Sequence, residues 1–403
     1  MPDVSFDGLL VVSLIAFLCP LLVGLFPKVL RIPAVVLEIV AGIVVGPSGL
    51  GWVEVDLPIE ILALIGLAFL LFLAGLEIDL ARLRGRLLRL AGLGFALTLA
   101  LGVVAGLAFG AVDIVKHPLF VAITLSATSL GLIVPVLKDA RQAGSEMGQL
   151  TIAAASVADF AAVVLLTLFF STEAAETSTK LILLIGFALL AAVAAIVLSR
   201  AERSARLEMV FVKLQDTTAE IRVRLAVLLL IAFVALAETL GLEAILGAFL
   251  AGAILNLVDR DTMSTHPNFR LKLEAIGYGF VVPVFFVTSG LRFDLEALLD
   301  SPSAFLRIPL FFVALLIVRG VPALLYASAV GRRQAIAAGL LQATSLPFIV
   351  TATQIGLILG EISPVTAAAL VSAGLLSVIV FPPVALSLLR KDAPAAPAPA
   401  PTG

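Results

Sequence analysis

Ala-Thr-Ser-Leu at residues 127–130 recurs as Ala-Thr-Ser-Leu at residues 343–346, and each copy lies inside a long apolar run. A second pair follows almost the same spacing. Leu-Ala-Gly-Leu-Glu-Ile-Asp-Leu at 73–80 is echoed by Thr-Ser-Gly-Leu-Arg-Phe-Asp-Leu at 288–295. The two offsets are 216 and 215 residues. Short matches among common residues arise by chance, but matches in one order at one spacing indicate an internal duplication.

A third, shorter echo pairs Leu37-Glu38 and Gly42 with Leu242-Glu243 and Gly247, at an offset of 205 residues. Between these echoes the chain is a series of apolar runs, most of them long enough to cross about 30 Å of hydrocarbon as a helix. We predict an all-α polytopic membrane protein with about thirteen transmembrane helices, at residues 8–26, 33–47, 58–79, 88–112, 118–137, 147–171, 181–199, 225–240, 243–258, 273–291, 303–328, 334–359 and 364–389.

The duplication predicts two repeats of opposite orientation, because its offset spans seven predicted helices and seven is an odd number. Inverted repeats are the plan of many secondary transporters. We therefore divide the chain into four parts. These are a first repeat with a linker helix (1–200), a basic cytoplasmic loop (201–224), a second repeat (225–389) and a Pro/Ala-rich tail (390–403) that we expect to be disordered.

The charges support the count of thirteen. If the predicted loops are assigned alternately to two sides, 21 of the 26 Lys and Arg residues fall on one side and three on the other. The remaining two, Arg307 and Arg319, lie inside the segment 303–328. By the positive-inside rule the N-terminus is outside and the C-terminus is cytoplasmic. We expect a cell (inner) membrane location.

Composition excludes several classes of protein. The chain is 61% hydrophobic and 13% charged, too apolar for a soluble domain to cover its surface with polar groups. It shows no basic face with interleaved aromatic residues, so we expect no nucleic-acid partner. No phosphate-binding loop, nucleophile–base pair or metal cluster is visible, so we expect no cofactor and no enzymatic activity.

Asp159 is the strongest candidate for a functional residue. It lies near the centre of the segment 147–171 with apolar neighbours, whereas most other acidic residues, including Glu77, fall at segment ends and are expected to be solvated. A charge in the middle of a bilayer costs at least ~2.5–3.5 kcal/mol, so it needs a reason. Asp159 suits a group that gains and loses protons. The alternative is a protonated Asp that is hydrogen-bonded between helices.

Two further charges lie within predicted segments. Arg319 is the only basic residue deep inside one, and its guanidinium can balance a buried carboxylate without losing its proton. The alternative is a side chain that extends to the membrane interface. Glu38, in the short second segment, is a possible functional acid or a buried structural one.

The two Ala-Thr-Ser-Leu stretches predict two broken helices. Pro135 follows the first and Pro347 follows the second. Proline removes a backbone donor, and nearby hydroxyls can satisfy the freed groups. Broken helices in corresponding positions of two repeats indicate an ion site at the membrane midplane. Simple kinks with packing hydroxyls are the alternative. The hydroxyl candidates are Thr128, Ser129, Thr344 and Ser345.

The chain resembles the monovalent cation:proton antiporter-2 branch of the cation/proton antiporter superfamily, over essentially residues 8–389. Five stretches carry the resemblance: Ile-Pro-Ala-Val-Val-Leu-Glu-Ile-Val-Ala-Gly at 32–42 with Gly46-Pro47, Leu-Ala-Gly-Leu-Glu-Ile-Asp at 73–79, Ser-Ala-Thr-Ser at 126–129, Ala-Ser-Val-Ala-Asp at 155–159, and Pro-Val-Phe-Phe-Val-Thr-Ser-Gly-Leu at 283–291.

This resemblance implies a thirteen-helix homodimer with a dimerisation part and a mobile core, in which the two broken helices cross. Asp159 matches the family's ion- and proton-binding aspartate, and Arg319 matches its basic position. Relatives usually carry Asp, Asn or Gln before that aspartate, but this chain has Ala158. Ser156 or Thr128 would then replace the missing partner.

We therefore expect a secondary antiporter that exchanges Na⁺, or else K⁺ or Li⁺, for H⁺ by alternating access, with the cation bound at Asp159. Exchange of one cation for one proton is expected to be electroneutral. The alternative is a cation channel or membrane sensor that retains the antiporter fold. The expected partners are monovalent cations, protons, the lipid bilayer and a second copy of the chain.

Overall fold

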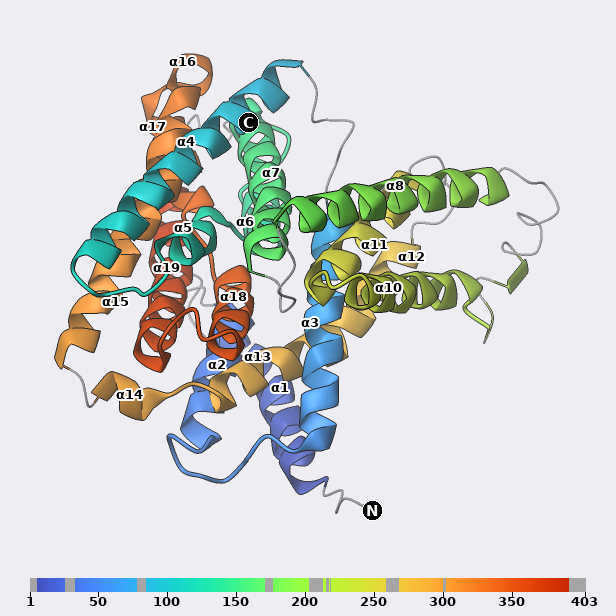
Figure 1. Ribbon diagram of the computed structural model, residues 1–403, viewed down its shortest axis with the longest axis horizontal. Helices are drawn as coiled ribbons and strands as arrows, with labels where there is room; N and C mark the ends of the chain where they lie inside the picture. Colours follow the sequence, from blue (N-terminus) through green and yellow to red (C-terminus); the bar gives the residue numbers. More distant parts are fainter. Residues whose placement is uncertain are drawn as a thin grey trace, which may run out of the picture.

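The computed structural model describes residues 6–25, 33–77, 85–170, 177–202, 213–214, 217, 219–258, 268–299 and 302–390. The described chain is built from helices joined by short connections (Figure 1). The helices of its first half are α1 (Asp7–Leu25), α2 (Ala34–Val45), α3 (Leu57–Glu77), α4 (Gly85–Ala111), α5 (Pro118–Ser126), α6 (Leu130–Asp139), α7 (Glu146–Phe169) and α8 (Thr177–Glu202).

The second half contains several composite helices, in which α, π and 3₁₀ turns follow one another. Its elements are α10 (Ile221–Thr239), α11 (Ala244–Val258), α12 (Asn268–Ile276), the π-helix η2 (Gly277–Val281), α13 (Val282–Leu291), α14 (Leu295–Leu299), α15 (Pro302–Leu315), the π-helix η3 (Leu316–Gly320), the 3₁₀ helix η4 (Val321–Tyr326), α16 (Ala327–Val330), α17 (Arg332–Gln342), α18 (Pro347–Ile358) and α19 (Pro364–Arg390).

Each of the thirteen predicted apolar segments coincides with a helix or a composite helix. Within the described residues, nine helices are long and apolar enough to cross a membrane, and three more apolar helices, in the ranges 34–45, 118–134 and 244–258, are shorter. The segment 225–240 corresponds to α10, which carries Arg222, Arg224 and Glu238. The count of thirteen crossings therefore stays a prediction. Most of the predicted loop 201–224, and the tail beyond Arg390, lie outside the described residues.

The helices form two groups. In the first, α2 packs on α13, α3 packs on α11 and α13, α1 packs on α2, and α10 packs on α11 and α12. In the second, α4 packs on α5 and α7, and α15 and α17 pack on α19. Figure 1 shows α3, α10 and α11 on one side and α4, α5, α15 and α19 on the other. We call these the α3/α11 group and the α7/α19 group.

Crosswise packing relates the two halves of the α3/α11 group. A side-chain carbon added at Gly42 of α2 would meet the backbone of Val287 in α13, and one added at Gly290 would meet the backbone of Ile39 in α2. α11 and α3 cross equally closely, because Gly252 of α11 faces the backbone of Phe72 and Gly75 of α3 faces that of Phe249. Small residues let helix backbones approach this closely. The pattern is the one expected of two repeats.

This packing corrects the register of one echo. The structure pairs Gly42 with Gly252, because each glycine faces a helix of the other repeat, α13 or α3. Gly247, its predicted counterpart, faces the backbone of Phe233 in α10 instead. The offset between α2 and α11 is therefore 210 residues, closer to the 215 and 216 of the other two pairs. The match between Glu38 and Glu243 was a coincidence of sequence.

Both predicted broken helices are present. The first break, residues 127–129, separates α5 from α6, and the second, residues 343–346, separates α17 from α18. Pro347 begins α18, where its missing N–H would have no partner in any case. Pro135 does not make the first break, because it lies inside α6. The N–H groups freed by the first break are satisfied differently, by a side chain of α7.

A candidate ion site at the first helix break

Asp159 of α7 caps the first break. Its Oδ1 accepts a hydrogen bond from the backbone N–H of Thr128 at 3.1 Å, and its Oδ2 accepts one from the N–H of Leu130 at 3.3 Å. The side chain is 8% exposed. These donors lie at the N-terminal end of α6, where the helix dipole favours a negative charge. The predicted central position of Asp159 is confirmed, and the break supplies its hydrogen-bond donors.

Thr128 joins the first break to the second. Its Oγ1 donates a hydrogen bond to the backbone carbonyl of Gln342, the last residue of α17. The second break has its own cap from α19, since the Ser345 N–H donates to Ser377 Oγ at 3.2 Å. The helix that follows each break is thus approached by one polar side chain from a neighbouring helix, an acid in the first case and a hydroxyl in the second.

Arg319 lies behind the breaks and is 1% exposed. Its Nε donates to the Gln342 carbonyl at 3.3 Å and to Thr128 Oγ1 at 3.4 Å, and Nη1 donates to Thr98 Oγ1 of α4 at 3.4 Å. The alternative of an Arg that reaches the membrane interface is therefore wrong. Arg319 forms no ion pair with Asp159. It acts on that carboxylate electrostatically, from the other side of Thr128.

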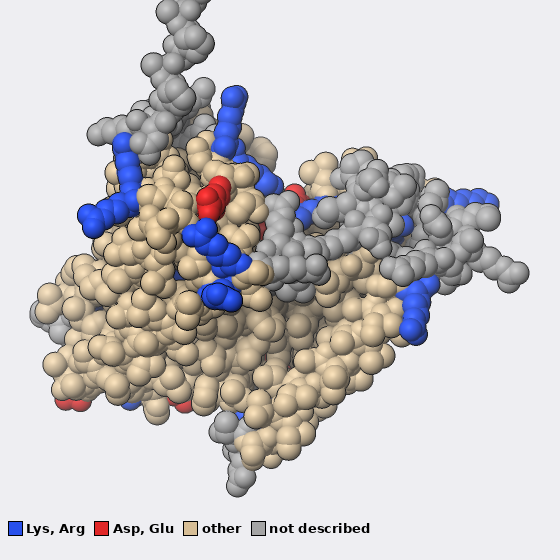
Figure 2. Space-filling view, turned by 90° about the horizontal axis from the view of Figure 1, so that it is seen from above, with Lys and Arg blue, Asp and Glu red and all other residues tan. Residues whose placement is uncertain are grey.

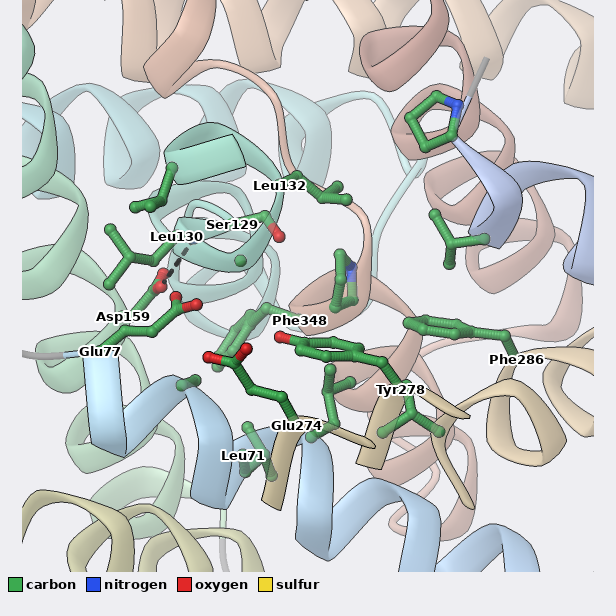
Figure 3. Close-up of a pocket in the computed structure, with 18 of the residues that line it drawn as sticks. Leu71, Glu77, Ser129, Leu130, Leu132, Asp159, Glu274, Tyr278, Phe286 and Phe348 are labelled. Carbon is green, nitrogen blue, oxygen red and sulfur yellow. Dashed lines mark hydrogen bonds between the residues drawn. The ribbon is translucent and has the colours of Figure 1, made fainter. Parts of the chain in front are cut away.

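A cavity of about 490 Å³ opens on the carboxylate, between the two helix groups. Its walls include Asp159, Thr128 and Ser129 from the α7/α19 group. The α3/α11 group contributes three further acids, Glu38 of α2, Glu77 of α3 and Glu274 of α12. Figure 3 shows the carboxyl groups of Asp159, Glu77 and Glu274 along this cavity, with Tyr278 and Phe286 farther from Asp159.

The remaining predicted residues lie apart from the cavity. Ser156 is buried, and its Oγ donates to the carbonyl of Ile152 one turn earlier in α7 at 2.9 Å. Ala158 is fully buried and does not line the cavity. Thr344 and Ser345 are buried at the second break and are also absent from the cavity wall. The backbone of the first break, rather than Ser156, supplies the donors to Asp159.

Sequence reasoning missed several residues of this site. Glu77 was expected to be a solvated helix end, yet it lines the cavity and its Oε2 is buried. Gln342 and Thr98, which hold Arg319 in place, carry no signal in the sequence. Glu38 was left open, and the structure places it in the cavity wall with 4% exposure. A signal for Glu77 existed in the echo of 73–80, where Arg292 stands at the corresponding position.

Nothing in the described part of the chain resembles a resident metal centre, because no three His, Cys, Asp or Glu side chains are grouped closely enough to hold an ion. Oxygen ligands from carboxylate, hydroxyl and backbone groups suit small hard cations.

The two helix breaks, the repeats and the buried Asp159 match the structural plan of secondary transporters with inverted repeats. Comparison with known proteins gives the family. Residues 13–391 match the family described as "Sodium/hydrogen exchanger, transmembrane", and the chain belongs to this family. It is thus a multi-pass membrane protein.

Relatives and a solved structure agree with this assignment. YjbQ of Bacillus subtilis is 32% identical over 408 residues, which cover 97% of this chain and 64% of YjbQ. An Enterococcus hirae protein named Na(+)/H(+) antiporter is 32% identical over 278 residues, 65% of this chain and 67% of that protein. The sodium proton antiporter MjNhaP1 of Methanocaldococcus jannaschii shares the fold, with a TM-score of 0.63 and 19% identity over 95% of this chain and 98% of its own.

Proposed function

We propose that this chain is a secondary antiporter that exchanges a monovalent cation for H⁺ across a membrane, with Na⁺ as the first candidate for the cation. One observation carries the proposal. Both oxygens of Asp159 are held by the backbone of a broken helix, while the same carboxyl group faces a cavity between two helix groups. The names of the relatives support Na⁺ and H⁺ as the exchanged ions.

The chemistry follows from the single carboxylate. A buried negative charge must be compensated, and either a proton or a small cation can do so. The two cannot occupy the same oxygens together, so they compete for Asp159. The N–H groups of Thr128 and Leu130 keep the carboxylate oriented in both states. Apart from the gain and loss of a proton by Asp159, transport of this kind forms and breaks no covalent bond, so we propose no enzymatic activity.

Alternating access would be provided by movement of one helix group against the other. Asp159 belongs to the α7/α19 group, and the opposite wall of the cavity belongs to the α3/α11 group. A displacement between the groups would close the cavity on one side and open Asp159 to the other. We propose that the α7/α19 group is the mobile core, and that the chain functions as a homodimer.

For the orientation, we propose an outside N-terminus and a cytoplasmic C-terminus in the cell membrane. The uneven distribution of Lys and Arg in the sequence supports this arrangement. On the face seen in Figure 2, Lys and Arg side chains gather along the upper edge above a broad uncharged band. A protease site inserted after Leu389 should be cleaved only from the cytoplasmic side. Cleavage from outside would reverse the assignment.

The direct test is ion flux in proteoliposomes that contain the purified chain and a pH-sensitive dye. An imposed Na⁺ gradient should drive saturable proton movement in the opposite direction, and Li⁺ and K⁺ tested in turn would define selectivity. A large current without proton coupling would favour the channel alternative. Proton movement that does not respond to any of the three cations would refute the proposal.

A further inference from the structure

Glu77 occupies an unusual position for an acidic residue at a helix end. It is the last residue of α3 and lines the cavity that opens on Asp159. Its Oε2 is buried and has no hydrogen-bond partner in the part of the chain that the structure describes. Figure 3 shows its carboxyl group directed to the same part of the cavity as that of Asp159, and the two are close enough to interact electrostatically.

The neighbouring acid differs in this respect. Glu274 of α12 lines the same cavity, but its Oε1 accepts a hydrogen bond from Arg270 Nε at 3.0 Å, which makes an ion pair within one helix. Two acids of similar chemistry therefore face one cavity, and of the two only Glu274 has a cationic partner among the described residues.

Glu77 has no ion-pair partner among the basic side chains of the described residues. Lys138 of α6 and Arg270 of α12 also line the cavity and act on Glu77 electrostatically, but neither is paired with it. A carboxylate oxygen that is buried without a partner is unfavourable, and a second carboxylate nearby adds to the cost. A cation bound between the two carboxyl groups would relieve both costs.

We infer that Glu77 is a second carboxylate ligand for the transported cation, which binds first at Glu77 and passes from there to Asp159. The inference rests on the function proposed above. Glu77 belongs to the α3/α11 group and Asp159 to the α7/α19 group, so the two ligands lie on opposite walls. A cation held by both would also mark the state in which the cavity is loaded and ready to close.

Steady-state exchange in proteoliposomes tests this role through Glu77→Gln, with Glu60→Gln as the matched control, because Glu60 lies at the other end of α3, pairs with Arg292 and does not line the cavity. Because Glu77→Gln removes one charged ligand, it should raise the apparent KM for Na⁺ about tenfold and leave kcat within about twofold. Glu60→Gln should leave KM within about twofold. Equal KM values for Glu77→Gln and the wild type, or equal increases in the two variants, would overturn the inference.

A binding measurement without turnover separates this inference from the proposed function. Na⁺ should raise the melting temperature of the detergent-solubilised wild type, and Glu77→Gln should need about tenfold more Na⁺ for the same shift. If Glu77→Gln does not fold, Glu77→Asp, which keeps the charge on a shorter side chain, should show a smaller increase in KM. An unchanged Na⁺ response in the variant that folds would refute the role of Glu77, whereas a wild type without exchange would refute the proposed function.

Discussion

At the scale of single residues, the site contains two charges of different kinds. The negative charge of Asp159 can be compensated by a proton or by a cation, whereas the positive charge of Arg319 is fixed. Asp159 faces the cavity, and within the part of the chain that the structure describes its hydrogen-bond donors are backbone N–H groups. Arg319 is buried behind it and stays protonated at physiological pH. Thr128 stands between them, with its N–H on the carboxylate and its Oγ1 on the guanidinium side. The fixed charge can therefore stabilise the ionised carboxylate without taking the place of the cation.

Asp159→Asn should abolish exchange while the protein still folds. An amide cannot bind a proton in exchange for a cation, and it can keep one of the two backbone hydrogen bonds at a cost of roughly 1 kcal/mol. The measurement is Na⁺-driven proton flux, which should fall to the level of empty liposomes. Ser156→Ala is the control and should retain flux, because Ser156 Oγ bonds only within α7. Flux like that of the wild type in Asp159→Asn would exclude this carboxylate as the exchange site.

Thr128→Ala should raise the apparent KM for Na⁺ about three- to tenfold, since it removes a hydroxyl that links Gln342 and Arg319. The backbone N–H of residue 128 remains on Asp159, so expression and folding should change less than affinity. Thr128→Ser keeps the hydroxyl and should behave like the wild type. A drop in expression with an unchanged KM would make the stretch purely structural.

The site residues that could be predicted from the sequence are those whose charge is unusual for their apolar surroundings. Asp159 is an acid in an apolar run, and Arg319 is a base in another. The tertiary structure places both side chains beside the helix breaks. Glu77 is not unusual in this sense, because acids at helix ends are common and usually solvated. Its burial depends on how α3 packs against the other helix group, which no local pattern records.

At the scale of elements, the two helix breaks differ in what caps them. The acid of α7 caps the first, and Ser377 of α19 occupies the equivalent place at the second. A neutral hydroxyl satisfies the Ser345 N–H without bringing a charge. The repeat thus yields one carboxylate site rather than two, although both halves contain the same Ala-Thr-Ser-Leu stretch.

Gly252→Ala should destabilise the helix crossing between α11 and α3 by roughly 1–3 kcal/mol, because the new methyl group would meet the backbone of Phe72 and Leu76. The melting temperature in detergent should fall accordingly. Gly92→Ala in α4 is the matched control, since nothing lies within 4 Å of the added carbon. It should be neutral or stabilising by up to ~1 kcal/mol. Equal melting temperatures for the two variants would contradict the close crossing.

Apolar runs predicted the elements well, since each predicted segment coincides with a helix, a composite helix or a broken helix. They could not give the register between the repeats, because both glycines of α11 are compatible with the echo and only packing distinguishes Gly252 from Gly247. The repeated Ala-Thr-Ser-Leu stretch located the first break correctly, but its cause was attributed to Pro135, which lies inside α6. A proline within a helix can be accommodated when neighbouring groups satisfy the freed carbonyl.

At the scale of the whole molecule, the distribution of acids between the helix groups determines how much charge a conformational change would carry. Among the described residues, four acids line the cavity, of which Glu38, Glu77 and Glu274 belong to the α3/α11 group. Asp159 is the only one of them on the α7/α19 group. If that group moves, only the ions bound to Asp159 travel with it, and the other three acids keep their places.

This division predicts electroneutral exchange of one cation for one proton. In one half-cycle Asp159 would carry the cation, and in the other it would carry the proton, so each crossing transfers the same net charge. Arg319 moves with the same group in both half-cycles, and its constant charge cancels. A second carboxylate that only hands over the cation from the opposite wall does not alter this balance. The membrane potential should therefore neither drive nor oppose exchange.

Reversal-potential measurements in proteoliposomes test the prediction. The Na⁺ and H⁺ gradients are varied until no net proton flux occurs, first without and then with a K⁺-diffusion potential set by valinomycin. The balance point should stay where the two chemical gradients are equal. The same result is expected for Glu38→Gln, because that residue would remain in the stationary wall. A balance point that moves with the imposed potential would mean that a second charge crosses the membrane, and that an acid of the α3/α11 group moves with the ion or carries a proton of its own.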